Sequence, residues 1–135
     1  MVPFEKCFIM LSTKNTEQEC LLRNLFGDRR SRLDDLREIK LGDVGFLLNT
    51  SRNELIGVFA AASQAQLNID EGAWQGEFPA QIRVAPMGEI KHLLEGDLLL
   101  AKAGVQLAPL PSGRLVPVLP VQPREVGLRL IQAFE

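Results

Sequence analysis

The chain contains one tryptophan, Trp74, which lies in a polar loop over residues 64–76, between Gly72 and Gly76. A tryptophan of the core is less expected in such a loop. An aromatic face presented by a flexible loop is a natural platform for a planar base, and each stacked base contributes roughly 1–3 kcal/mol. The alternative is that Trp74 folds back as a lid over a sheet edge. Replacing Trp74 with alanine separates the two, because a platform loses only binding and a lid also loses its fold.

The most basic part of the sequence lies over residues 28–40, where Arg29, Arg30 and Arg32 are close together. Guanidinium groups in such a run suit contacts to phosphates. The alternative is an ordinary solvated surface. The formal net charge of −2 gives no bulk attraction to nucleic acid or to an anionic membrane. Tight, sequence-independent binding of polyanions is therefore disfavoured, whereas a local basic patch is compatible with the sequence.

Catalytic and metal-binding patterns are missing from the sequence. The single histidine, His92, could act as an acid or a base, or could be a surface or capping residue. The adjacent carboxylates at 34–35 and 70–71 diverge on a regular helix or strand. None of the common nucleotide-binding, hydrolase or metalloprotease motifs occurs, and no cluster of metal ligands is visible. The sequence predicts a protein that is not an enzyme and that uses no metal or cofactor.

Length and composition set the frame for these candidate residues. The 135 residues, of which 46% are hydrophobic and 24% charged, predict one globular domain over residues 1–135. Cys7 and Cys20 are expected to be reduced, buried small residues. The N-terminus lacks the pattern of a signal peptide, and glycines and prolines interrupt the apolar stretch 98–121, so it cannot be a membrane helix. We expect a soluble, cytoplasmic protein.

Strands dominate the predicted secondary structure. We expect them at 4–11, 44–49, 55–62 and 78–84, with shorter ones at 98–100, 105–107 and 115–119. The second half of the first strand is apolar on both faces, which is typical of a central strand. In the fourth, the pattern predicts one buried face with Ala80, Ile82 and Val84.

Helices are expected near both ends of the chain. The spacing of Thr16 and Glu19 predicts a capping box and a helix that ends near Gly27. Its predicted core-facing residues are Cys20, Leu21, Leu22 and Leu25. A short amphipathic helix is expected within 28–40 and weak helical character over 87–94. A last helix over 124–134 follows Pro123, with Val126, Leu130 and Phe134 on its buried side. The fold class is therefore α+β, with a curved or barrel-like sheet.

The order of several short segments resembles that of the development and cell death (DCD) domain over about residues 4–94. Those segments are CFIM at 7–10, LFG at 25–27, IKLG at 39–42, LIGVF at 55–59, AAS at 61–63, LNID at 67–70, AW at 73–74 and FPAQIR at 78–83. The DCD domain is in turn similar to the YTH and EVE domains of the PUA-like group. The resemblance implies a PUA-like curved mixed sheet or open β-barrel flanked by helices.

The resemblance also implies a set of site residues. YTH domains bind RNA through an aromatic cage that holds a methylated adenine. In this sequence the resemblance places cage walls at Phe26 and Trp74 and an aliphatic closure at Ile69, where an aromatic residue is expected. The implied polar contacts to the base are Ser12, Thr13, Lys14, Asn68 and Asp70. Beside these residues, the basic run noted above would place Arg29, Arg30 and Arg32 in contact with phosphates.

The leading hypothesis is a non-enzymatic domain that binds single-stranded RNA around a flipped or methylated base. The alternative is a protein-interaction module that binds a peptide in the same groove. Salt dependence separates them, because phosphate contacts weaken steeply with salt and an apolar groove does not. A third possibility is an enzyme acting on a modified nucleotide, with His92 or Asp70 as its acid or base.

Overall fold

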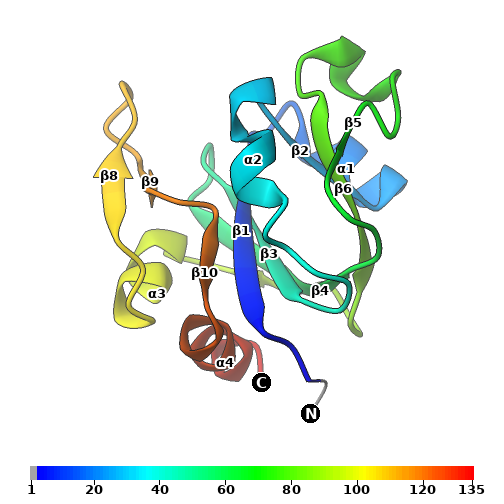
Figure 1. Cartoon of the computed structure of the whole chain (residues 1–135). Helices are drawn as coiled ribbons and strands as arrows, with labels where there is room; N and C mark the ends of the chain where they lie inside the picture. Colours follow the sequence, from blue (N-terminus) through cyan, green and yellow to red (C-terminus); the bar gives the residue numbers. More distant parts are fainter. Residues whose placement is uncertain (1–2) are drawn as a thin grey trace.

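The first strand, β1 (Lys6–Ser12), lies inside a curled mixed sheet in the computed structural model, which describes residues 3–135 (Figure 1). The order of the sheet is β10-β1-β3-β4-β6-β2, with β5 paired to β6 and β7 paired to β4. β1 and β3 are parallel, and the other pairs are antiparallel. A separate hairpin is formed by β8 and β9.

The remaining elements follow in chain order. They are α1 (Glu17–Arg23), β2 (Leu25–Asp28), η1 (Arg30–Arg32), α2 (Leu33–Leu36), β3 (Val44–Asn49), β4 (Glu54–Ala61), β5 (Gln66–Leu67), η2 (Ala73–Gly76), β6 (Ala80–Pro86), β7 (His92–Leu93), α3 (Gly96–Lys102), β8 (Leu107–Pro109), β9 (Leu115–Pro117), β10 (Val121–Pro123) and α4 (Arg124–Ala133).

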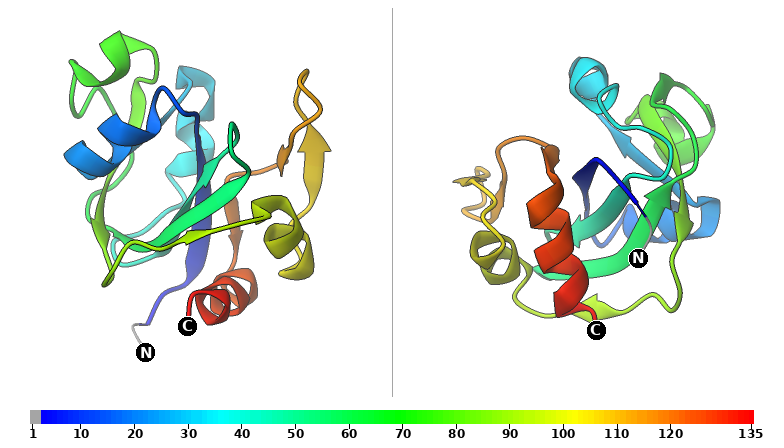
Figure 2. Two further views of the ribbon diagram at one scale, coloured as in Figure 1. Left: turned by 180° about the vertical axis from the view of Figure 1, so that it is seen from behind. Right: turned by 60° about the horizontal axis from the view of Figure 1, so that its bottom comes forward.

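The sheet has a hydrophobic core on each face, and β1 contributes to both. Phe8 and Met10 belong to the first core, whereas Cys7 and Ile9 belong to the second. Because successive side chains of a strand point to opposite faces, this placement confirms the prediction of a central strand that is apolar on both sides. α1 and α2 contribute to the first core, and α3 and α4 to the second. Figure 2 shows α3 and α4 together, away from α2.

Several elements confirm the sequence predictions. β3 and β4 lie where strands were predicted and pair antiparallel, and Ala80, Ile82 and Val84 are all buried along β6. α4 follows Pro123 and buries Val126, Leu130 and Phe134. The predicted α+β fold class, with a curved mixed sheet flanked by helices, is confirmed.

The first helix is shorter than predicted. α1 ends at Arg23, because Asn24 turns the chain with a left-handed φ of 50°, and Leu25–Asp28 then form β2 against β6. Leu22, which we expected in the core, is 75% exposed. The capping box is not formed: the Thr16 hydroxyl accepts a hydrogen bond from the Thr13 N–H at 2.8 Å.

Two predictions after residue 86 are wrong. Residues 87–94 form no helix, because the edge of β4 pairs with β7 and the Gly57 N–H donates to the Lys91 carbonyl at 2.9 Å. Residues 98–100 lie in α3 rather than in a strand, and Leu100 packs into the second core. Among the helices of residues 3–135, none has the length and apolar character needed to cross a bilayer.

Both cysteines are free and buried, as predicted. Burial, reinforced by the charge of Asp43, raises the pKa of the Cys7 thiol to about 12. Burial and the charge of Glu17 likewise raise the pKa of the Cys20 thiol to about 12. With a pKa of about 12, roughly one thiol in ten thousand is ionised at pH 8. The thiolate is the reactive form, so both thiols should be inert.

We therefore expect neither thiol to react with a chromogenic disulfide reagent at pH 8 while the protein is folded. After denaturation, two equivalents of reagent should react per chain. The absorbance of the thiolate that the reagent releases gives the number of reactive thiols in the folded and in the denatured protein. Rapid labelling of one thiol in the native protein would contradict the burial of that cysteine.

Candidate binding pocket

A pocket of about 320 Å³ lies where the ends of β1 and β3 meet α1, β2, η2 and the β8–β9 hairpin. Its volume is at the lower end of the range typical of small-molecule sites. The lining residues are Leu11, Ser12, Thr13, Thr16, Cys20, Gly27, Asp28, Arg29, Arg32, Thr50, Trp74, Phe78, Leu110, Val116 and Pro117. The pocket therefore combines one aromatic wall, one aliphatic wall and a few polar groups.

Trp74 is 5% exposed and lines the pocket while packing into the first core. Its backbone N–H donates to the Glu19 carboxylate at 2.8 Å, and its indole N–H donates to the Thr16 carbonyl at 3.2 Å. Both N–H groups of Trp74 are thus tied to α1 and its N-cap residue. Arg23 holds this arrangement by pairing with Glu19 at 3.2 Å and with Asp70.

The backbone of η2 turns the indole inward. Trp74 and Gln75 both have left-handed backbones, with φ values of 49° and 55°. Such a conformation costs about 1–2 kcal/mol for each residue other than glycine. It persists only where the surroundings determine it, and the two bonds to α1 supply that constraint. The backbone around Trp74 is therefore held in one conformation, which agrees with the lid alternative from the sequence rather than with a flexible platform.

Gly27 makes room for the indole over β2. A Cβ atom at this position would lie 2.5 Å from Cζ3 of Trp74 and 3.1 Å from Cβ of Phe78. Phe78 packs edge-to-face against Trp74, with ring centroids 5.9 Å apart. A glycine on β2 and an aromatic pair from the η2–β6 segment therefore form this wall together.

Two polar groups of the pocket have unused hydrogen-bonding capacity. Ser12 is 3% exposed, and within residues 3–135 its hydroxyl oxygen is the one buried side-chain polar atom that lacks a hydrogen-bond partner. Such a group in a native protein requires an explanation. Asp28 accepts a hydrogen bond from the Arg29 N–H through Oδ1 at 2.7 Å. Burial raises the pKa of the Asp28 carboxyl, although Arg29 and Arg32 oppose this effect.

Two of the three predicted arginines reach the pocket. Arg29 and Arg32 line it, whereas Arg30 is exposed on η1 and does not. The Arg32 guanidinium pairs with Asp35 at 3.2 Å and donates to the Val118 carbonyl at 3.3 Å. Arg32 thereby connects η1 to the segment that follows the β8–β9 hairpin.

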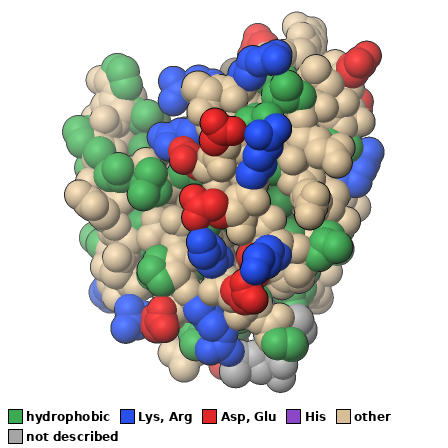
Figure 3. Space-filling model, in the orientation of Figure 1, with side chains coloured by type: hydrophobic (Ala, Val, Ile, Leu, Met, Phe, Trp, Pro, Cys, Tyr) green, Lys and Arg blue, Asp and Glu red, His purple; other side chains and the backbone are tan. Residues whose placement is uncertain are grey.

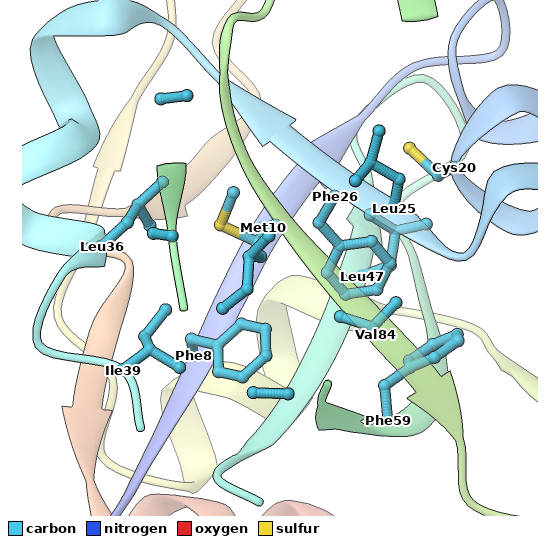
Figure 4. Packing of buried hydrophobic residues seen from close by; sticks show 14 of the residues in the cluster. Phe8, Met10, Cys20, Leu25, Phe26, Leu36, Ile39, Leu47, Phe59 and Val84 are labelled. Atoms are coloured by element: carbon cyan, nitrogen blue, oxygen red, sulfur yellow. The ribbon is translucent and has the colours of Figure 1, made fainter. Parts of the chain in front are cut away.

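Phe26 is a core residue and does not form a pocket wall, which corrects the expectation drawn from the resemblance. It is fully buried and packs edge-to-face against Phe59 and Phe8, with centroid distances of 4.9 and 6.3 Å (Figure 4). Successive side chains of a strand face opposite sides. The Phe26 side chain therefore points into the first core, while Gly27 faces the indole.

The other predicted base contacts divide into two groups. Ser12 and Thr13 line the pocket with Trp74, Arg29 and Arg32. Ile69, Asn68, Asp70 and Lys14 do not line it. Ile69 packs against the first core, and Asn68 is exposed with a φ of 55°.

Asp70 and Lys14 have structural contacts instead. Asp70 pairs with Arg23, and its backbone N–H donates to the Gln81 side chain at 2.7 Å. The Arg23 side chain, with lesser help from the Gly72 N–H, holds the pKa of the Asp70 carboxyl below its usual value. The Lys14 side chain is exposed, and its backbone N–H donates to Ser51 Oγ at 3.0 Å.

The structure adds pocket residues that the sequence did not indicate. Two of them, Asp28 and Phe78, were not predicted as site residues, although both belong to segments described above. Asp28 directly precedes the arginine run, and Phe78 begins the segment FPAQIR. The aliphatic wall consists of Leu110, Val116 and Pro117 from the β8–β9 hairpin. No local signal places that hairpin against residues about 100 positions earlier.

Away from these residues, the fold assembles a charged network that the sequence did not reveal. Within the described residues, Glu17, Glu54 and His92 lie within 4.8 Å of one another through potential metal-ligand atoms. Arg52, however, donates to both carboxylates, at 2.6 and 3.2 Å. Burial opposes ionisation of Glu54, but bonds from His92 and Arg52 outweigh it and hold its pKa below the usual value. The guanidinium thus supplies the positive charge that this cluster requires.

A protein-family model described as "Development and cell death domain" matches residues 6–101. Curated relatives include the B2 protein of Daucus carota, which is 45% identical over 84 residues, and the DCD domain-containing protein NRP-B of Glycine max, which is 42% identical over 84 residues. Each match covers 57% of this chain, but only 41% and 26% of the two relatives. The matched segment is thus less than half the length of either relative.

Solved YTH domains share the fold at low sequence identity. A structure entitled "Crystal structure of the MmI1 YTH domain" has a TM-score of 0.70 and 10% identity, covering 96% of this chain and 94% of that one. The Pho92 YTH domain, solved in complex with m6A, has a TM-score of 0.66 and 15% identity, covering 99% of this chain and 86% of that one. The curled sheet and its flanking helices are therefore those of a YTH-like fold.

Proposed function

Since the chain belongs to the development and cell death domain family, we propose that it is a non-enzymatic module that binds single-stranded RNA. One base enters the pocket beside Trp74. The proposal treats residues 1–135 as one domain that acts in the cytoplasm without metal or cofactor. Its main support is the buried, unpartnered hydroxyl of Ser12 in a pocket with an indole wall.

The shape and chemistry of the pocket suit a base. Trp74 and Phe78 contribute aromatic carbon to its lining, and Leu110, Val116 and Pro117 contribute aliphatic carbon. A flat, weakly hydrated ring gains from both walls, because stacking tolerates any base. In its more specific form, the proposal is that the bound base is methylated, since a methyl group adds apolar area to the contact with the pocket.

Solved structures of the same fold support the proposal that the pocket holds a methylated base. The Pho92 YTH domain is solved in complex with m6A, and the Zygosaccharomyces rouxii MRB1 YTH domain in complex with N6-methyladenosine RNA. The aromatic residues that line this pocket are Trp74 and Phe78, and the β8–β9 hairpin adds aliphatic residues to the lining. The proposed pocket is therefore a mixed slot rather than a cage of aromatic rings.

Phosphate contacts would come from Arg29 and Arg32 at the pocket, with Arg30 beside them. On the face shown in Figure 3, basic and acidic side chains are interspersed rather than segregated. The electrostatic contribution to binding is therefore local. With two phosphate contacts, the logarithm of the affinity should fall with the logarithm of the salt concentration with a slope of about 1.4.

A peptide in the same groove is the second candidate. Hydrophobic side chains gather over the side of the molecule that carries the β8–β9 hairpin (Figure 3), where Leu115, Val118 and Leu119 are 37%, 37% and 53% exposed. This surface adjoins the aliphatic wall of the pocket. A partner with apolar side chains could therefore cover both.

The test uses the fluorescence of Trp74, the only tryptophan. Short single-stranded RNAs with a central adenine or N6-methyladenine are titrated at low and at high salt. We expect saturable quenching that weakens with salt, and weaker binding by a Ser12→Ala variant that keeps its fold. Unchanged fluorescence with every RNA, together with salt-independent binding of an apolar peptide, would replace the RNA proposal with the peptide alternative.

A further inference from the structure

Asp28 lies at the end of β2, half-buried, and lines the pocket together with Ser12. Its Oδ1 atom accepts the Arg29 N–H. In the described part of the chain, neither an ion pair nor a further hydrogen bond involves its second oxygen. The Arg32 guanidinium, although close enough to influence the carboxylate electrostatically, pairs with Asp35 instead. One carboxylate oxygen in the pocket is therefore uncommitted.

The fold gains little from a carboxylate at this position. A single bond to the neighbouring N–H would form equally well with asparagine or serine, which also accept from a nearby backbone donor. Burial raises the pKa of Asp28, which means that the charged form is less favourable in the folded chain than in the unfolded one. A partly desolvated carboxylate whose second oxygen has no partner in the fold is typical of a functional site.

We infer that Asp28 is a specificity-determining residue, and that its free oxygen accepts a hydrogen bond from an exocyclic N–H of the bound base. This inference rests on the proposed RNA binding and names the class of base. An ionised carboxylate only accepts hydrogen bonds, so the base must present a donor to it. Ser12, whose hydroxyl can both donate and accept, provides the second polar contact.

The ligand class is therefore an amino-bearing base that retains at least one N–H. Adenine, cytosine, guanine and N6-methyladenine meet this condition, and carboxylates are known to accept from the amino group of cytosine. N6,N6-dimethyladenine has the same ring and more apolar area but no exocyclic N–H. A purely apolar slot would accept the dimethylated base, whereas a slot that contains Asp28 rejects it.

The experiment compares three RNAs that differ only in a central adenine, N6-methyladenine or N6,N6-dimethyladenine. For the native chain we expect the dimethylated RNA to bind about ten- to a hundredfold more weakly than the monomethylated one, which is the usual effect of losing a hydrogen bond to a charged group. In Asp28→Asn the ratio should fall below about threefold, because the amide oxygen takes the Arg29 N–H and the amide then presents its NH2 group, a donor, to the base in place of the second oxygen.

Asp34→Asn is the matched control. It changes the net charge equally, but Asp34 is exposed, pairs with Arg37 at 3.3 Å and does not line the pocket. We expect it to keep the full discrimination. The thermal midpoint at pH 7 gives a second readout: Asp28→Asn should be no less stable than the native chain, because the amide avoids the unfavourable burial of charge. Reduced discrimination in a fully stable variant identifies a role in recognition.

The outcomes separate the two proposals. If the native chain binds the adenine and N6-methyladenine RNAs but binds the dimethylated RNA equally well, the role of Asp28 is overturned and RNA binding stands. Unchanged discrimination in Asp28→Asn has the same meaning. If the native chain binds none of the three RNAs, the proposed function and this inference both fail.

Discussion

Replacing Phe26 with alanine is expected to lower the free energy of unfolding by about 3–5 kcal/mol, the usual cost of removing a buried phenylalanine. Phe26 is fully buried between Phe8 and Phe59, so its loss leaves a cavity at the centre of the first core. Because small domains are stable by only about 5–15 kcal/mol, the variant should be close to unfolding. Urea denaturation followed by circular dichroism measures the change.

The variant Phe26→Leu separates a core role from a stacking role. Leucine retains most of the apolar volume but has no aromatic face. We expect this variant to fold and to bind RNA like the native chain, because Phe26 does not line the pocket. A well-folded Phe26→Leu protein that had lost RNA binding would mean that Phe26 is a wall of the site after all.

Replacing Trp74 with alanine should remove both stability and binding. The side chain is 5% exposed, so truncation is expected to lower the free energy of unfolding by about 3–5 kcal/mol. It also removes the indole donor to Thr16 and thus part of the constraint on two left-handed residues. The alanine variant alone therefore cannot distinguish a platform from a lid, in contrast to the expectation from the sequence.

Trp74→Phe makes that distinction. Phenylalanine keeps an aromatic face over Gly27 but loses the indole N–H, so the fold should be weakened less than by alanine. If the ring stacks on a base, the affinity for RNA should decrease only moderately in Trp74→Phe. It should be clearly lower still in a folded Trp74→Leu protein, which has no aromatic ring. Fluorescence anisotropy of labelled RNA measures both affinities. Equal affinity in the phenylalanine and leucine variants would make Trp74 a purely structural residue.

The extent to which the sequence predicted the fold follows from the strength of each local pattern. β3, β4, β6 and α4 have clear apolar periodicity or a helix-starting proline, and all four were predicted. α3 was predicted as a strand because Leu98, Leu99 and Leu100 form an apolar run with no period of its own. Its helix begins where Asn53 bonds both the backbone N–H and the carboxylate of Asp97, at 3.0 and 2.8 Å, and these contacts are remote in sequence.

The candidate site was predictable only in part, for a similar reason. Trp74 and the arginine run stood out by residue type, and the resemblance added Ser12 and Thr13. Phe26 was placed wrongly because a matching order of residues does not fix the direction in which each side chain points. The aliphatic wall could not be predicted, since it depends on how the β8–β9 hairpin packs against the end of β1.

The last strand has a consequence for the synthesis of the protein. β10 covers the outer edge of β1, with Lys6 opposite Pro123, yet Cys7 and Pro123 are 116 positions apart in the chain. At roughly 5–20 residues per second, the ribosome needs on the order of ten seconds to make the intervening chain. During that time the edge of a strongly apolar strand has no native partner and could pair with another nascent chain. Completion of this fold therefore has to wait for a segment beyond residue 101, where the match to the family model ends.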